Sequence, residues 1–247
     1  MGILEKGQKG FTIIEVMLFL AVSGALAAGV LGSSSVAINN QRYVDATNSF
    51  KSLIQGEMVA STRVVNDASE KTSCLWDQVY NGSSEKQAIG TSDCVIMGRA
   101  LGVKNGQDVI TTNIIGKPAS SSDVYANDTE AINAFRPIID GTNQKNTELN
   151  WDTHIKNNES FIVYILRSPQ SGNIVIRTQR SIAPSLFENR MASGYKIPAI
   201  SSLDAGTQNI CVDASGLTVA QQQTVIINAN TSGPSGIEQR TGQAGCL

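Results

Sequence analysis

The sequence predicts an α+β fold in which one long amino-terminal helix packs against an antiparallel β-sheet. Three observations lead to this prediction. An apolar run with a single charge begins at Phe11 and continues to Leu31. Directly after it, apolar residues recur every three or four positions, as they do on one side of a helix. The carboxy-terminal third instead contains short apolar segments separated by turn-forming residues, a pattern typical of antiparallel sheets.

The apolar run is long enough to cross a membrane as a helix. About 20 helical residues span the hydrocarbon core of a bilayer, and between Phe11 and Arg42 the only charged residue is Glu15. Lys6 and Lys9 precede the run, so the positive-inside rule leaves the amino end in the cytoplasm and places the rest of the chain outside.

The helix is expected to continue from about Thr12 to about Val65, half in the membrane and half beneath a globular domain. The apolar stripe of the second half consists of Val36, Tyr43, Ala46, Phe50, Leu53, Ile54 and Met58. Gly24, Gly29 and Gly32 interrupt the first half, and each glycine weakens a helix by about 1 kcal/mol relative to alanine.

The predicted strands lie mainly in the carboxy-terminal third. Residues 161–166 are apolar on both faces, as in a buried strand, and turn formers connect them to a second strand at 174–178 in an antiparallel hairpin. Residues 209–212 and 224–228 add two more strands. In the polar stretch 67–160, residues 94–103 predict one or two strands.

The beginning of the apolar run differs from an ordinary signal peptide. Signal peptides are cleaved after the apolar region, and residues 23–25 or 27–29 could serve as such a site; a plain signal anchor is another alternative. Against both stand Gly10 directly before the run and Glu15 four residues into it. An unpaired carboxylate in a membrane helix is costly and usually marks function.

The stretch Lys9-Gly10-Phe11-Thr12-Ile13-Ile14-Glu15-Val16-Met17-Leu18 resembles the amino terminus of type IV pilins and type II secretion pseudopilins. The resemblance implies that a prepilin peptidase cuts after Gly10 and that the new terminus, Phe11, is N-methylated. It also implies that Glu15 pairs with the amino terminus of a neighbouring subunit during filament assembly, because two charges in an apolar core are tolerated only when paired. It is strong over residues 6–31 and extends to the rest of the chain in outline.

The resemblance also predicts the pilin fold and its organisation along the chain. Residues 209–228 are similar to H-type minor pseudopilins and minor pilins, which favours a low-copy subunit. The expected segments are a leader at 1–10, a transmembrane and filament-core helix at 11–32, the amphipathic half of that helix at 33–66, a variable helix-to-sheet region at 67–160, and an antiparallel sheet with a disulfide-bounded end at 161–247.

The four cysteines all lie on the exported side, where disulfides form, and no two have the spacing of metal ligands. Three pairings are possible in principle. We predict the pairing of sequence neighbours, Cys74 with Cys94 and Cys211 with Cys246, and the second pair resembles the disulfide that bounds the carboxy-terminal region of many pilins.

No enzymatic function is expected. The only histidine, His154, lies in a polar stretch that favours a solvated loop over a catalytic triad. Phosphate loops, dinucleotide fingerprints and zinc-ligand spacings do not occur in the sequence, so neither a cofactor nor a metal is predicted. Asp204 and Asp213 could help to bind calcium, but turn formation is the favoured interpretation.

A basic segment between Phe161 and Leu203 provides a weaker hypothesis, DNA binding, because cations with interleaved aromatic residues can hold a nucleic-acid backbone. Against it, the net charge is −2 and residues 204–247 contain one arginine, whereas DNA-binding H-type relatives have a basic carboxy-terminal region. The alternative is that these cations line the solvent edge of a sheet. The candidate residues are Arg167, Arg177, Arg180, Arg190 and Lys196.

Together these observations predict a structural subunit of a type IV pilus, and a minor one. It would be an inner-membrane protein before assembly and part of an extracellular filament afterwards. Its expected partners are other pilin subunits, prepilin peptidase, the inner-membrane assembly platform and the bacterial membrane. The alternatives are a type II secretion pseudopilin, or a minor pilin that acts as DNA receptor or adhesin.

Overall fold

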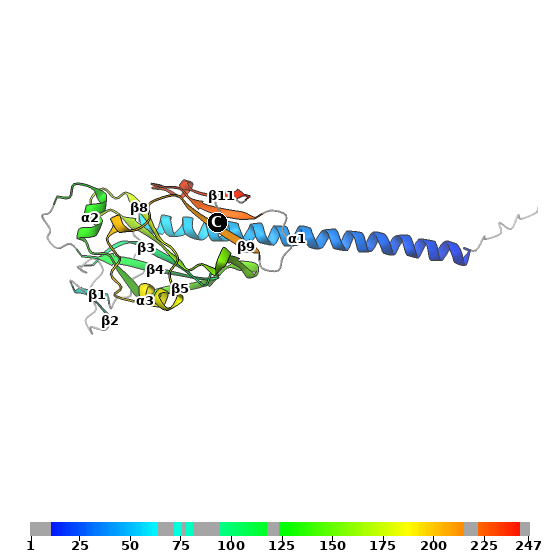
Figure 1. Ribbon diagram of the computed structural model, residues 1–247, viewed down its shortest axis with the longest axis horizontal. Coiled ribbons are helices and arrows are strands. Elements are labelled where there is room, and N and C mark those ends of the chain that lie inside the picture. Colours follow the sequence, from blue (N-terminus) through cyan, green and yellow to red (C-terminus); the bar gives the residue numbers. More distant parts are fainter. Residues whose placement is uncertain are drawn as a thin grey trace, which may run out of the picture.

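The protein consists of a long helix whose second half is enclosed by a globular domain and whose first half extends far beyond it (Figure 1). The computed structural model describes residues 11–63, 72–75, 78–81, 94–117, 124–214 and 222–242, without the side chains of 72–75, 78–81, 142–143 and 214. In the domain, α1 lies between two antiparallel sheets, and shorter helices cover the outer face of the larger sheet. The α+β class predicted from the sequence is confirmed.

The helix α1 spans Ile13–Arg63 without a break. One side of the helix from Tyr43 onward is buried, because both sheets contact this half, whereas Val44 on another side is 36% exposed. The predicted stripe is confirmed in the domain, where Leu53 is partly buried. Val36 lies before the domain begins and is 46% exposed. The glycines of the first half do not interrupt the helix.

The larger sheet has five antiparallel strands in the order β5-β4-β3-β7-β8. One face packs on α1 and the other against α3 and the segment 195–203. The close approach of α3 requires Gly102, since a Cβ there would lie 2.7 Å from the Phe187 ring. The strands are β3 (Val95–Lys104), β4 (Asp108–Gly116), β5 (Ile138–Glu148), β7 (Phe161–Arg167) and β8 (Ile174–Gln179).

The smaller sheet has four antiparallel strands in the order β11-β10-β9-β6 and covers the opposite side of α1 (Figure 1). Its strands are β6 (Thr153–Ile155), β9 (Gln208–Ala214), β10 (Gln223–Ile227) and β11 (Ile237–Thr241). The remaining elements are the hairpin of β1 (Thr72–Leu75) and β2 (Gln78–Asn81), the helices α2 (Asp128–Ala134) and α3 (Pro184–Met191), and the short turns η1 (Asn150–Asp152), η2 (Lys156–Asn158), η3 (Ile200–Ser202) and η4 (Pro234–Gly236).

The structure differs from the sequence prediction in how the strands are grouped. The hairpin β7–β8 and the pair β9–β10 occur as predicted, but they belong to different sheets. The other strands of the sheet that contains β7 and β8 are β3, β4 and β5, which come from the stretch between helix and hairpin, where the sequence predicts one or two strands. The pairing is set by long-range contacts on α1, which a local pattern does not contain.

Two polar contacts fix α1 within this apolar core. Near the start of the buried half, the Tyr43 hydroxyl donates to the carbonyl of Val212 at 2.5 Å and accepts from the backbone N–H of Gln223 at 2.7 Å. Near the end, Nε of Arg99 on β3 donates to Oε2 of Glu57 at 2.7 Å, and Arg99 Nη1 donates to Oδ1 of Asn113 on β4. The helix is therefore tied to the smaller sheet near the start of its buried half and to the larger sheet near its end, where the Gln55 side-chain amide also donates to the carbonyls of Pro234 and Ile237.

We predict that Arg99→Met destabilises the domain by about 3–5 kcal/mol, because it leaves the Glu57 carboxylate buried without its cation. The two side chains are only 7% and 11% exposed. The free energy of unfolding would be measured by chemical denaturation of the full chain in detergent. The double variant Glu57→Leu/Arg99→Met should recover much of the loss.

The matched control is Arg240→Met, which removes a cation from the exposed pair with Glu238. This change should cost no more than about 1 kcal/mol. Equal effects of the two arginine substitutions would contradict the prediction.

Candidate functional site

The candidate site is the first turn of α1. Thr12 precedes the helix and caps it, since its side-chain Oγ1 and its carbonyl both accept from the backbone N–H of Glu15, at 3.3 and 3.0 Å. Glu15 is exposed in the first helical turn, where a carboxylate is favoured by the helix dipole. Its side chain lies within one turn of Phe11, which is 79% exposed.

After this turn, the apolar first half of α1 is exposed. Its large apolar residues from Phe11 to Leu31 are 46–79% exposed, and it is the one helix among the described residues that is long and apolar enough to span a membrane. Such a surface is far larger than a monomeric protein leaves in water. The chain must bury it in a bilayer or against other molecules.

Comparison with known proteins identifies this end of the chain. The family model described as the prokaryotic N-terminal methylation motif matches residues 6–31. The chain carries the class III leader of type IV pilins and pseudopilins. Neither the curated proteins nor the solved structures give a match.

The leader implies processing by a prepilin peptidase and assembly with other pilin subunits. It also fits a prepilin anchored in the membrane by the apolar helix. Gly10 and the leader segment 1–10 lie outside the described residues, so cleavage after Gly10 and methylation of Phe11 stay predictions for this chain.

The cysteine pairing also stays a prediction. Cys94 and Cys211 are each disulfide-bonded. The partners predicted for them are Cys74, whose side chain is outside the described part of the structure, and Cys246, which is outside it entirely.

The basic residues proposed for DNA binding do not form one surface. Arg167 pairs across the hairpin with Ile174, which faces α1, whereas Arg177 pairs with Tyr164, which faces α3. Two of the three interleaved aromatic residues, Tyr164 and Phe187, are fully buried, and burial raises the pKa of the Tyr164 hydroxyl. Neither ring is available to stack on a base.

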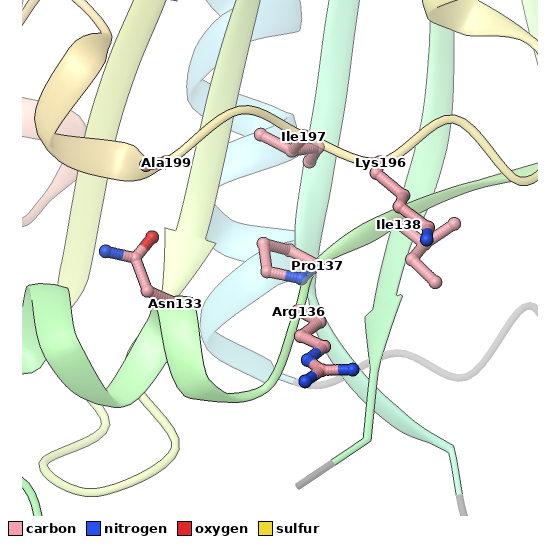
Figure 2. A pocket seen from close by; sticks show the side chains of 7 residues that line it. All are labelled: Asn133, Arg136, Pro137, Ile138, Lys196, Ile197 and Ala199. Atoms are coloured by element: carbon pink, nitrogen blue, oxygen red, sulfur yellow. The ribbon is translucent and has the colours of Figure 1, made fainter. Parts of the chain in front are cut away.

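The other three cations are also dispersed. Arg180 forms an ion pair with Glu159, with Nη2 to Oε2 at 2.5 Å and Nε to Oε1 at 3.0 Å. Arg190 belongs to the last turn of α3. Lys196 lines a pocket of about 420 Å³ between the end of α2 and the segment 195–199, together with Asn133 and Arg136 (Figure 2).

The remaining candidate polar residues are held within the smaller sheet or in turns. His154 lies on β6 and not in the solvated loop that the sequence favours, and it pairs with Asp213, which lies on β9 and not in a turn. The carboxylate of Asp204 accepts from the backbone N–H of Gly206 and from the Gln208 side-chain amide, each at 2.8 Å. The Gly206 hydrogen bond, followed by that from Gln208, lowers the pKa of Asp204. This is the turn-forming role favoured from the sequence.

The buried polar contacts of α1 were not predicted from the sequence. Glu57 lies three residues after Ile54 and seven after Phe50, and so interrupts the apolar stripe, a signal that a buried cation partner must exist. That Arg99 is this partner could not be found, since it depends on the register of β3 beneath the helix.

We predict that the ion pair of Glu159 with Arg180 stabilises the domain fully at neutral pH and that this contribution is lost in acid. Burial of the Glu159 carboxyl raises its pKa, but the hydrogen bonds and charge of Arg180 outweigh burial, so the pKa lies below its usual value. A lowered pKa in the folded state contributes stability above the unfolded pKa of about 4.3, and this is lost as the pH falls through the folded value.

The measurement is the melting temperature of the full chain and of Glu159→Gln as a function of pH. Arg180 is 40% exposed, so the difference in free energy of unfolding between the two proteins should not exceed about 1 kcal/mol at pH 7. The difference in melting temperature should shrink in acid. A difference independent of pH would refute the assignment.

Proposed function

We propose that the protein is a structural subunit of a type IV pilus, and a minor one, without enzymatic activity. It is made as a prepilin, held in the inner membrane by α1, cleaved after Gly10, N-methylated at Phe11 and built into an extracellular filament by the assembly platform. The long exported part and the resemblance of residues 209–228 to minor pilins support the minor role.

The observation that carries the proposal is the division of α1 into a buried and an unburied half. From Tyr43 onward the helix is enclosed by the domain, while before it the helix offers an apolar surface with one carboxylate, Glu15. In a filament, neighbouring copies of such helices bury this surface, and the new amino terminus of one subunit neutralises Glu15 of another.

A type II secretion pseudopilin is the alternative that shares all these features. The two differ in where the mature protein accumulates, in sheared surface filaments or only in the membrane. A DNA receptor has no support from the arrangement of the cations, and the adhesin alternative rests on residues 67–160, which the structure describes only in part.

We predict that mass spectrometry of filaments sheared from the cells finds a peptide beginning at N-methylated Phe11. Gly10→Val should abolish this peptide and leave the precursor in the membrane, because the peptidase requires the small residue at the cut. A mature product of unchanged size from this variant would refute the assignment. Processed protein found only in membranes would favour the pseudopilin.

We also predict that Glu15→Ala leaves cleavage intact and lowers incorporation into filaments at least about tenfold. The substitution leaves a buried, charged amino terminus of the neighbouring subunit without its carboxylate partner, which costs several kcal/mol. The measurement is the ratio of filament to membrane protein by immunoblot. The matched control is Ser34→Ala on the same exposed helix, which should incorporate normally. Normal incorporation of Glu15→Ala would contradict the pairing.

A further inference from the structure

A cation and an aromatic ring meet where α1 enters the domain. The guanidinium carbon of Arg42 lies 4.8 Å from the centre of the Trp151 ring, within the range of a cation–π interaction. Arg42 directly precedes Tyr43, the first buried residue of α1, and is exposed. Trp151, although the largest side-chain type, is 52% exposed. The pair therefore lies where the buried half of α1 begins, at the base of the domain. Figure 1 shows the other half of α1 leaving the domain.

The outward position of Trp151 is imposed by its surroundings. The residue has φ 60° and ψ 38°, and the following Asp152 also has a positive φ of 53°, a conformation rare for bulky residues. On either side the chain is fixed in the core by Leu149, whose N–H donates to Gln107 at 3.1 Å, and by Ile155, whose N–H donates to Gly106 at 2.7 Å. The backbone on both sides of Trp151 is therefore held in place, and the ring lies half exposed beside Arg42.

The helix places this pair close to the membrane surface. A hydrocarbon core of about 30 Å takes about 20 residues, and the cost of Glu15 inside it favours a core that starts just after this carboxylate. The core then ends near Val36, four residues beyond the transmembrane segment 11–32 expected from the sequence. Arg42 lies six residues further along, about 9 Å at the helical rise. The headgroup zone is about 5–8 Å deep, and an arginine side chain reaches several ångströms toward it.

The local charges favour a particular kind of contact. In the part of the chain that the structure describes, Arg42 has no carboxylate partner. Asp45 follows Arg42 on α1, Asp152 follows Trp151 in η1, and Asp213 on β9 follows Val212, whose carbonyl accepts from Tyr43. These carboxylates mean that this end of the domain does not attract a negatively charged surface as a whole. A contact in which an indole lies among the headgroups and one arginine binds a phosphate does not require a positively charged surface. Tryptophan and arginine are common at membrane interfaces.

We propose that Arg42 and Trp151 form an anchor that holds the base of the domain on phospholipid headgroups of the outer leaflet of the inner membrane before the subunit is assembled. The Trp151 ring lies at the headgroup level and Arg42 donates to a lipid phosphate. The anchor holds the domain at a fixed height above the bilayer. It rests on the membrane-anchored state of the prepilin and not on the fate of the filament.

The test uses the full chain in phosphatidylcholine nanodiscs, in a Trp76→Phe background that leaves Trp151 as the sole tryptophan. Spin-labelled lipids quench tryptophan fluorescence at the depth of the label. A label at the headgroup should quench Trp151 at least about twofold more than a label at the end of the acyl chain. The quenching should persist when the salt concentration is raised, because the indole and not bulk charge carries the contact.

Arg42→Ala should reduce headgroup quenching of Trp151, and Lys51→Ala, one cation further into the domain, should leave it unchanged. The tryptophan emission of Arg42→Ala is also recorded in detergent micelles. A change in the loop alone would appear equally in micelles and nanodiscs, whereas a lost lipid contact would appear only in nanodiscs. Absence of headgroup quenching, equal quenching by both labels, or an Arg42→Ala effect that is identical in micelles would overturn the proposal. Failure of Glu15 variants to alter assembly would leave this measurement untouched.

Discussion

The burial of one half of a single helix between two sheets is the constraint on which the rest of the structure depends. A helix is usually covered along one stripe, but the second half of α1 is contacted by β3 and β7 on one side and by β10 and β11 on the other. Neither sheet could bury its inner face without this helix. The domain therefore depends on the second half of α1, and the apolar first half is a continuous extension of the same helix.

The sequence allowed the long helix, its apolar stripe, the β7–β8 hairpin and the β9–β10 pair to be predicted, because each depends on local periodicity and turn chemistry. The sandwich around α1 could not be predicted. Strands such as β3, with Arg99 and two glycines, and β4, with three consecutive polar residues at 111–113, do not read as strongly apolar. They become central strands only because the helix and α3 cover their two faces.

The candidate site, unlike the sheet arrangement, could be predicted largely from the sequence. Gly10, Phe11 and Glu15 were identified from sequence because their chemistry depends on order along the chain, and the structure adds the Thr12 cap at the turn that carries Glu15. The basic residues do not lie on one surface, because residues that are close in the sequence on adjacent strands can lie on opposite faces of the sheet. Arg167 and Arg177 are ten residues apart, yet the alternation of β-strands directs them to opposite faces.

The polar contacts of α1 explain how the two halves of the helix act together. Apolar packing tolerates small rotations and translations of a helix, but hydrogen bonds and a buried ion pair are directional. Tyr43 fixes the helix at the base of the domain and Glu57 fixes it four turns later. Because α1 is continuous, the same contacts determine which direction Glu15 and the apolar surface face relative to the domain. In the filament that we propose, that relation would have to be the same in every subunit, and the directional contacts of the buried polar groups would fix it.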